Sequence, residues 1–299
     1  MIHEYYKYEI TPPTHLCLYN KNHQNHTLDF FSKLESFCNE DAHQILIDFS
    51  KLEFLSAAAA NYFFSLVIYN QLKLNNSLFT YKLPKDKKQK KLFIDSGFHR
   101  AIKAGGMNKI KNLWETSDFL CGHNDDRAKL LKLIKERCNI VPFPDKLSSA
   151  IKETFLNIHH HAYVDFRNPV LITWFCYFYI NEDDSGRYLS IIVQDLGQGM
   201  VNSIKNAFPD YKAKADHDCI KYAMTKSVTS THTQGRGQGS FDIKKPLIYN
   251  KMKGNDNLFI ISAHGSYNYS ISDDSEEFQH SNNLDLFIRG TLIEWTLYY

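Results

Sequence analysis

Residues 149–162, "SAIKETFLNIHHHA", contain neither Gly nor Pro and predict a helix with one chemically unusual side. At 100° per residue, that side carries Glu153, Asn157, His160 and His161. The opposite side is apolar and can pack against a sheet. An amide oxygen is a suitable ligand for Mg²⁺, and a carboxylate one turn earlier could take a proton from an attacking water or hydroxyl.

Two other interpretations of this helix stay open from its residues alone. An amphipathic helix often exposes a polar side to solvent without using it for chemistry. A zinc site on a helix needs His at positions i and i+4, but the residue four before His161 is Asn157. Consecutive His side chains also point in different directions, so they cannot all bind one ion.

The stretch "QDLGQGM" (194–200) follows a predicted buried strand, "RYLSIIVQD" (187–195). An aspartate at the end of a strand, here Asp195, can accept a hydrogen bond from an exocyclic amine. Gly197 and Gly199 would let the backbone approach a flat ligand closely. A plain turn explains the same pattern equally well.

A second glycine-rich stretch, "THTQGRGQGSFDIKK" (231–245), precedes a run that can form a helix. Its glycines alternate along the chain at Gly235, Gly237 and Gly239. Backbone N–H groups of such a loop and of the following helix start can hold phosphate oxygens, and Arg236 adds a positive charge. A long surface loop would have a similar composition, so this stretch does not decide the matter by itself.

With "IRGTLIEW" (288–295), these pieces resemble the sequence boxes of the GHKL ATPase superfamily, which includes DNA gyrase and the histidine kinases. The N box is "ETFLNIHHHA", the two glycine boxes are "DLGQGM" and "GRGQGSFDIKK", and the last box is the Gly-Thr pair. Thr alone is ordinary in strands, so the family order of all four pieces carries the resemblance. It spans residues 125–299, and the pattern E-x-x-x-N-x-x-x-H-A is most similar to anti-sigma-factor kinases and sensor kinases.

At the phosphate end, the resemblance implies that Glu153 is the general base and that Asn157 binds Mg²⁺. His161, together with His160, would face the phosphates. The lid over them would be shaped by Gly235, Arg236, Gly237 and Gly239. The three consecutive His at 159–161 depart from the family, where Lys or Arg often precedes the last His.

At the adenine end, the resemblance implies that Asp195 accepts a hydrogen bond from the adenine amine. Thr291 would assist through a water. Gly197 and Gly199 would flank the base, and Met200 would pack on it.

Residues 43–102 resemble a STAS domain, the fold of anti-sigma-factor antagonists, through "ILIDFSKLEFLSAAAANYFFSLV" and "SGFHRAI". Strand-like segments at 43–50 and 77–83 flank a helix-like segment at 56–76, which predicts a crossover unit. In that family, the turn before the helix carries a serine that a partner kinase phosphorylates. Here the turn is "LSAAAA", with Ser56 followed by alanines, so we expect the acceptor to be lost and the domain to serve docking or packing.

The predicted fold class is α/β and α+β, with a small STAS-like α/β domain followed by a Bergerat-fold two-layer α/β sandwich. We expect the first domain at residues 1–105, a linker at 106–124 and the ATP-binding domain at 125–299. Near the end of the chain, "SISDDSEEFQHSNN" (270–283) is polar and acidic, which predicts a mobile loop.

Composition limits the alternatives. The hydrophobic share of 43% is typical of a globular chain, and a formal net charge of +2 gives no electrostatic argument for nucleic acid. The basic run "KDKKQKK" (85–91) is interpreted as a solvated loop. No apolar run approaches the roughly 18 residues that span a bilayer. The six cysteines have no metal-binding spacing, which predicts reduced thiols in a cytoplasmic protein.

We therefore expect a regulatory protein that binds ATP with Mg²⁺, hydrolyses it slowly, and changes its lid and a partner surface with nucleotide state. One alternative is a serine/threonine kinase of the anti-sigma-factor type that acts on a separate STAS protein. Another is a non-catalytic module that responds to nucleotide. The expected partners are ATP and either a regulatory protein or a second copy of the chain, with neither nucleic acid nor membrane.

Overall fold

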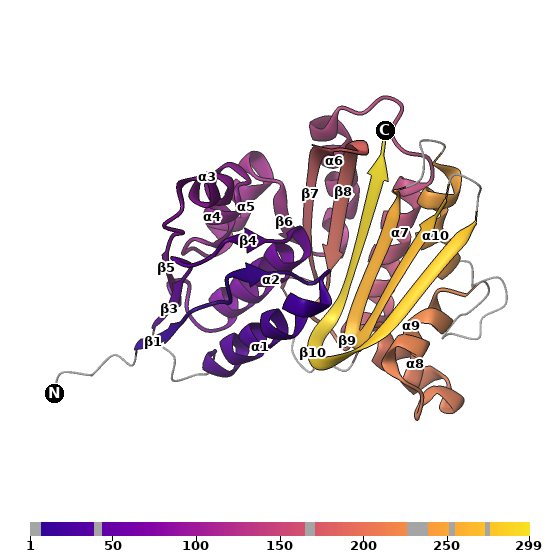
Figure 1. The fold of residues 1–299 in the computed structure, drawn as a ribbon, viewed down its shortest axis with the longest axis horizontal. Helices are drawn as coiled ribbons and strands as arrows, with labels where there is room; N and C mark the ends of the chain where they lie inside the picture. Colours follow the sequence, from indigo (N-terminus) through magenta and orange to yellow (C-terminus); the bar gives the residue numbers. More distant parts are fainter. Residues whose placement is uncertain (1–6, 39–43, 165–170, 226–238, 251–254, 273–275) are drawn as a thin grey trace. The chain divides into compact units, whose positions relative to one another are not determined.

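A computed structural model of the chain describes residues 7–38, 44–164, 171–225, 239–250, 255–272 and 276–299 (Figure 1). The chain divides into two compact units, Met1–Cys121 and Gly122–Tyr299. Both units combine helices with sheets, so the mixed class expected from the sequence is confirmed at that level.

The stretch expected to link two domains, residues 106–124, is folded. It contains helix α5 (Met107–Thr116) and strand β6 (Phe119–Gly122). Trp114 of α5 is buried, and its ring N–H donates a hydrogen bond to the Cys121 carbonyl at 3.1 Å. The glycines before α5 signal a break in local structure, but the helix is stabilised by the side that it buries.

The first unit is built around a parallel sheet of order β1-β3-β5. Its strands are β1 (Lys7–Ile10), β3 (Gln44–Asp48) and β5 (Phe79–Lys82), and a separate parallel pair consists of β2 (His15–Leu16) and β4 (Phe54–Leu55). Besides α5, its helices are α1 (Lys21–Phe37), α2 (Ala57–Lys73), α3 (Lys87–Asp95) and α4 (Phe98–Ile102). Parallel neighbours need crossover connections, which α1 and α2 supply.

Helix α2 begins at the alanine run. Ser56 is its N-cap, and the Ser56 hydroxyl accepts a hydrogen bond from Ala59 N at 3.3 Å. The Tyr19 hydroxyl accepts another from Ala58 N at 3.1 Å. Ser56 is buried, so its hydroxyl serves the start of a helix and is shielded from solvent.

The basic run at 85–91 is mostly helix α3, and the expectation of a solvated loop is wrong. Asp86 caps the helix by accepting a hydrogen bond from Gln89 N at 2.8 Å. Phe93 is buried and anchors the helix, whereas the lysines lie on its exposed side. Lysine favours helix formation when its charge stays in water, so a cap and one buried ring are sufficient here.

The second unit contains four strands of a sheet whose order is β6-β7-β8-β10-β9. They are β7 (Trp174–Asp183), β8 (Gly186–Gln194), β9 (Asn257–Ile271) and β10 (Glu277–Tyr298). The pairs β7–β8, β8–β10 and β10–β9 are antiparallel. Leu292 pairs with Gln194, so the last strand runs beside the end of β8 where Asp195 follows.

The helices of the second unit form one layer against this sheet, behind the strands in Figure 1. They are α6 (Arg127–Cys138), α7 (Leu147–Asn157), α8 (Gly199–Ala207), α9 (Asp216–Ala223) and α10 (Gly239–Tyr249), with short 3₁₀ turns at Asn124–Asp126 and Pro209–Tyr211. Helix α7 contacts α6 and α10, and α10 also contacts β9. The unit is therefore a two-layer arrangement of helices on an antiparallel-rich sheet.

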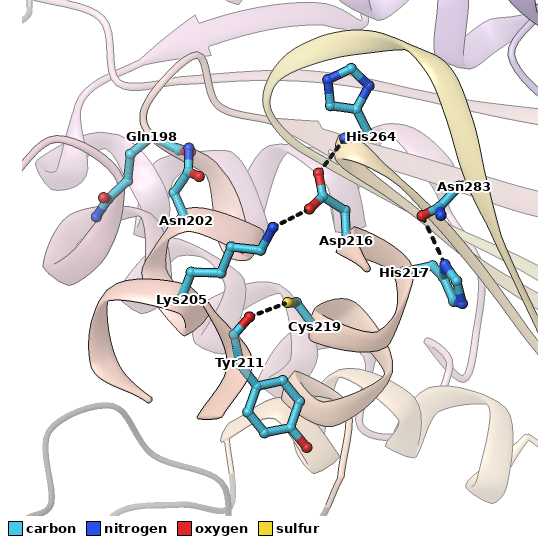
Figure 2. Close-up of polar contacts among 9 residues, drawn as sticks. All are labelled: Gln198, Asn202, Lys205, Tyr211, Asp216, His217, Cys219, His264 and Asn283. Atoms are coloured by element: carbon cyan, nitrogen blue, oxygen red, sulfur yellow. Dashed lines mark hydrogen bonds and ion pairs between the residues drawn. The ribbon is translucent and has the colours of Figure 1, made fainter. Parts of the chain in front are cut away.

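Polar contacts tie α8 and α9 to the β9–β10 hairpin (Figure 2). The Lys205 ammonium on α8 contacts Asp216 Oδ1 at 2.5 Å, and Asp216 Oδ2 accepts a hydrogen bond from His264 N at 2.9 Å. The side chains of His217 and Asn283 bond at 2.8 Å. Burial alone would raise the pKa of Asp216, but hydrogen bonds from Lys205 and His264 lower it and keep the carboxylate charged. The network fixes α8, the helix that follows the first glycine-rich loop.

The polar stretch at 270–283 is not a loop over the residues that the structure describes. Residues 265–271 of β9 and 277–283 of β10 pair with each other and form an arm beyond the pairing with β8. Tyr267 and Tyr269, which lie on one side of this arm, are fully buried. Backbone pairing and the burial of one side stabilise the strands, although their composition is polar.

The longest helices of the first unit, α1 and α2, have 17 residues each. In the described part of the chain, no helix is both long enough and apolar enough to cross a membrane.

Candidate functional site

Asp195 directly follows β8, and its carboxyl group is buried. Its Oδ1 accepts a hydrogen bond from Gly197 N at 2.8 Å. Burial raises the pKa of this carboxyl to about 7, although the N–H groups of Gly197 and Thr291 and the charge of Arg289 oppose the change. A carboxylate in such surroundings favours a ligand that donates a hydrogen bond to it.

The last strand supports this loop from the other side. Asp195 N donates to the Thr291 carbonyl at 3.0 Å, and Met200 N donates to the Thr291 hydroxyl at 2.8 Å. The Ser262 hydroxyl on β9 lies 3.3 Å from the Thr291 hydroxyl and donates to the Gly290 carbonyl at 2.8 Å. The Thr291 hydroxyl, expected to assist ligand binding through a water, therefore also anchors the start of α8.

The helix that carries Glu153 and Asn157 ends against the same loop. Gln198 N donates a hydrogen bond to the Ala162 carbonyl at 2.8 Å. The side-chain amide of Gln198 donates to the neighbouring His161 carbonyl. The structure thus joins three of the predicted stretches, the N box, the first glycine box and the Gly-Thr pair, through hydrogen bonds.

Gly197 and Gly199 are required by the packing of the protein itself. A Cβ at Gly197 would lie 2.1 Å from the Ala162 carbonyl oxygen. Gly199 has φ of +80°, and a Cβ there would lie 2.7 Å from the Gly290 carbonyl oxygen. At both positions, protein backbone fills the space where a Cβ would lie, so the packing of this loop by itself requires glycine.

Gly290→Ala is expected to destabilise the second unit by about 3 kcal/mol or more. Gly290 has φ of +75°, and a Cβ there would lie 1.9 Å from the Asp195 carbonyl oxygen. Gly186→Ala is the matched control, because Gly186 has φ of +128° but the nearest atom to its Cβ would be 4.0 Å away. Urea unfolding of the full chain should show the larger loss for the Gly290 variant, and equal losses would contradict the clash.

Glu153 and Asn157 lie one turn apart near the end of α7, and both are half-buried. Within the described residues, neither side chain has a hydrogen bond or an ion pair. Burial raises the pKa of Glu153, and the negative charge of Asp242 on α10 raises it further. A carboxylate and an amide that are shielded but unpaired are available to a water, a cation or a ligand.

After Asn157, the helix widens into a π-helical turn, Ile158–Ala162. The regular 100° spacing that we assumed for the whole stretch therefore ends at Asn157. His160 is exposed and His161 is half-buried. Burial lowers the pKa of His161, and the positive charge of the neighbouring His160 lowers it further.

Part of the expected site lies outside the described residues. Gly235, Arg236 and Gly237 belong to that part, and Gly239 is the first residue of α10. Over the ranges that the structure covers, no cluster of three or more His, Cys, Asp or Glu has the arrangement of a metal site. The expected Mg²⁺ ligand, Asn157, is an amide and would not belong to such a cluster.

Comparison with models of protein families, with curated proteins and with solved structures finds no match.

Several residues that complete the arrangement lie outside the sequence motifs or carry no signal there. The Tyr163 hydroxyl accepts a hydrogen bond from Leu196 N at 3.0 Å, and Arg289 Nε donates to the Leu196 carbonyl at 2.9 Å. Tyr163 follows the N box and Arg289 precedes the Gly-Thr pair, so both could have been predicted as site residues from their position next to a motif. Asp242 lies within the second glycine box, and the packing of α10 on α7 brings it to the site. Ser262 has no such signal, because only the pairing of β9 with β10 brings it there.

Proposed function

We propose that residues 122–299 form a GHKL-type ATPase unit with a Bergerat fold, which binds ATP with Mg²⁺ and hydrolyses it slowly. One observation carries the proposal. Glu153 and Asn157 are unpaired within the described residues, on a helix whose end is hydrogen-bonded to the Asp195 loop through Gln198. Folding alone does not favour half-buried polar groups without partners, whereas a catalytic site requires them.

Asp195 forms the adenine end of the proposed site. One of its carboxylate oxygens accepts from Gly197 N, and the adenine amine would donate to the other. Because burial raises the pKa of Asp195 to about 7, a donor from the ligand would also stabilise the charged form. Met200 and Thr291 belong to the same hydrogen-bonded loop and would flank the base.

Asn157 and Glu153 form the phosphate end. The Asn157 amide fits the role of Mg²⁺ ligand, because its oxygen has no competing hydrogen bond in the described residues. Bound there, the ion would neutralise charge on the phosphates. Glu153 would take the proton of the attacking water, and the burial and the Asp242 charge that raise its pKa make it a stronger base.

The first unit is proposed to be a STAS-like domain that docks a regulatory protein or a second copy of the chain. Its parallel sheet of order β1-β3-β5 and the start of α2 after Ser56 support this fold. The acceptor position of STAS antagonists falls in the alanine run, and Ser56 is a buried helix cap. We therefore assign this unit a docking role without phosphorylation. Six free thiols and the use of ATP support a cytoplasmic location.

Calorimetric titration of the full chain with ATP tests the proposed function. The wild type should bind ATP more tightly with Mg²⁺ than without it. Asn157→Ala should lose about tenfold of that metal-dependent affinity, because the ion loses its protein ligand. Asn181→Ala is the matched control, since the Asn181 amide on β7 is exposed and donates to the Tyr188 hydroxyl. Failure of the wild type to bind ATP would overturn the proposal.

Phosphoryl transfer to a serine of another protein is the second candidate. The alanine run at 57–60 removes the expected acceptor within this chain, so such an acceptor would belong to a separate STAS protein. Glu153 could activate a serine hydroxyl in the same way as a water. With γ-labelled ATP, a hydrolase releases labelled phosphate when the purified chain is alone, whereas a kinase transfers the label to the added protein. A binding module without catalysis would do neither.

A further inference from the structure

Three buried hydrogen-bond donors meet between α10 and the β9–β10 arm. The Lys244 ammonium on α10 lies 4.6 Å from the ring centroid of Tyr269 and 5.5 Å from that of Tyr267. Among the described residues, both tyrosine hydroxyls are buried and have no hydrogen-bond partner of normal geometry. Lys244 is also buried, and within the described residues its ammonium has no hydrogen bond and no ion pair.

Such a cluster is unfavourable unless something accepts its hydrogen bonds. A buried donor without a partner costs about 1–3 kcal/mol, and buried polar groups in folded proteins are nearly always paired. The two aromatic faces attract the ammonium, but this contact uses none of the hydroxyl hydrogens. Burial lowers the pKa of Lys244, and the negative charge of Glu277, which raises it, offsets this effect only in part.

Glu277, at the start of β10, is the negative charge that acts on this cluster. Its carboxylate raises the pKa of Tyr267 and of Tyr269, after the larger effect of burial. Glu277 itself is exposed, and its carboxylate also acts on the Tyr269 hydroxyl as a hydrogen-bond acceptor, although the contact lacks normal hydrogen-bond geometry. An exposed carboxylate therefore lies near the cluster at this end of the arm, but among the described residues the Lys244 ammonium and the Tyr267 hydroxyl have no acceptor of their own.

The cluster is separate from the proposed ATP site. Asp242 of α10 acts on Glu153 of α7, whereas Lys244, two positions later, lies over the tyrosines of β9. Two positions correspond to about 200° around a helix, so these two side chains point to opposite sides of α10.

We propose that Lys244, Tyr267 and Tyr269 form a binding site for a small oxyanion, either a phosphate or a carboxylate group. An ammonium and two hydroxyls can all donate to one ligand, and an oxyanion offers acceptors together with a negative charge placed within the cluster itself. A single buried water would add no negative charge. The site requires neither ATP binding nor hydrolysis by this chain.

Calorimetric titration of the full chain without nucleotide tests the site, with inorganic phosphate and acetate as separate probes. At least one anion should bind saturably, and the preferred probe identifies the class of oxyanion. Lys244→Met should weaken binding by about tenfold or more, and the double variant Tyr267→Phe with Tyr269→Phe should weaken it as well. Glu277→Gln should strengthen binding by about two- to fivefold, because it removes a nearby negative charge.

Lys245→Met is the matched control, because Lys245 is on the same helix but pairs with Asp242. Asn157→Ala alters the phosphate end of the proposed ATP site and should leave the anion affinity unchanged, which excludes binding there. Lys244→Met is expected to be at least as stable as the wild type, since methionine has a similar length and no charge to bury. If it does not fold, the tyrosine double variant gives the same test. Saturable binding that Lys244→Met and the tyrosine variant leave intact would overturn the proposal, as would no saturable binding of either anion.

Discussion

Glu153→Gln is expected to lower the rate of ATP hydrolysis by roughly 10²- to 10⁴-fold and to leave ATP affinity nearly unchanged. The amide has the shape of the carboxylate but cannot take a proton from the attacking water. Glu153 has no hydrogen bond or ion pair within the described residues, so the substitution removes no contact that stabilises the fold. Single-turnover phosphate release and calorimetric titration measure hydrolysis and binding separately.

A control variant and a second test distinguish a catalytic role of Glu153 from a structural one. Glu136→Gln alters an exposed carboxylate of α6 that pairs with Lys132, and it should not affect hydrolysis. Asp242 raises the pKa of Glu153, so Asp242→Asn should lower that pKa and move the acidic limb of the rate profile to lower pH. Hydrolysis at the wild-type rate by Glu153→Gln would exclude the role of base. Loss of ATP binding together with hydrolysis would indicate a structural role.

Asp195→Asn is expected to weaken ATP binding by roughly 100-fold. One oxygen of Asp195 already accepts from Gly197 N at 2.8 Å. In the variant, the amide oxygen would keep that bond, and the NH₂ group would face the amine of adenine, so two donors would meet. Asp256→Asn is the control, because Asp256 is a second buried carboxyl with a pKa raised by burial, to about 6, and it bonds Tyr298 N at the far end of β10. Equal ATP affinity in Asp195→Asn and the wild type would rule out this contact.

The same variant should stabilise the unit at high pH. Burial raises the pKa of Asp195 from an ordinary value of 3.8 to about 7, so the folded protein holds this proton more tightly than the unfolded chain. The protonated Asp195 carboxyl therefore contributes to the free energy of unfolding at low pH. That contribution falls as the pH rises between these two values, and it is gone above about pH 7. Relative to the wild type, Asp195→Asn should gain roughly 3–4 kcal/mol between about pH 4 and about pH 8. Denaturant unfolding at both pH values measures the difference, and a constant difference would contradict the raised pKa.

Some parts of the fold follow from short stretches of sequence. The apolar repeat of α7 indicates a helix that buries one side, and the continuous apolar run of β8 indicates a buried strand ending at Asp195. The order β3, α2, β5 of the first unit is visible in the same way. These features have local causes, because apolar periodicity and turn residues act within one or two turns of chain.

Other parts depend on partners that are distant in sequence. The polar stretch at 270–283 forms strands because β9 and β10 pair and bury Tyr267 and Tyr269, and no local pattern marks that burial. The basic run at 85–91 becomes a helix because Phe93 packs into the first unit. The linker expected at 106–124 folds for a similar reason, since Trp114 is buried.

For the site, the sequence by itself determined which polar groups exist and in what order: a carboxylate with an amide one turn later, a carboxyl after a buried strand, and a Gly-Thr pair in the last strand. Only the tertiary structure decided that the Ala162 carbonyl and the Thr291 hydroxyl hold the Asp195 loop, and that Asp242 acts on Glu153. It also decided that Lys244 lies over the rings of two tyrosines. The physical reason is that hydrogen bonds, packing contacts and charge interactions depend on which atoms lie within a few ångströms of each other in space. The pattern of one helix or strand shows which of its sides is buried, but it does not show which partner covers that side.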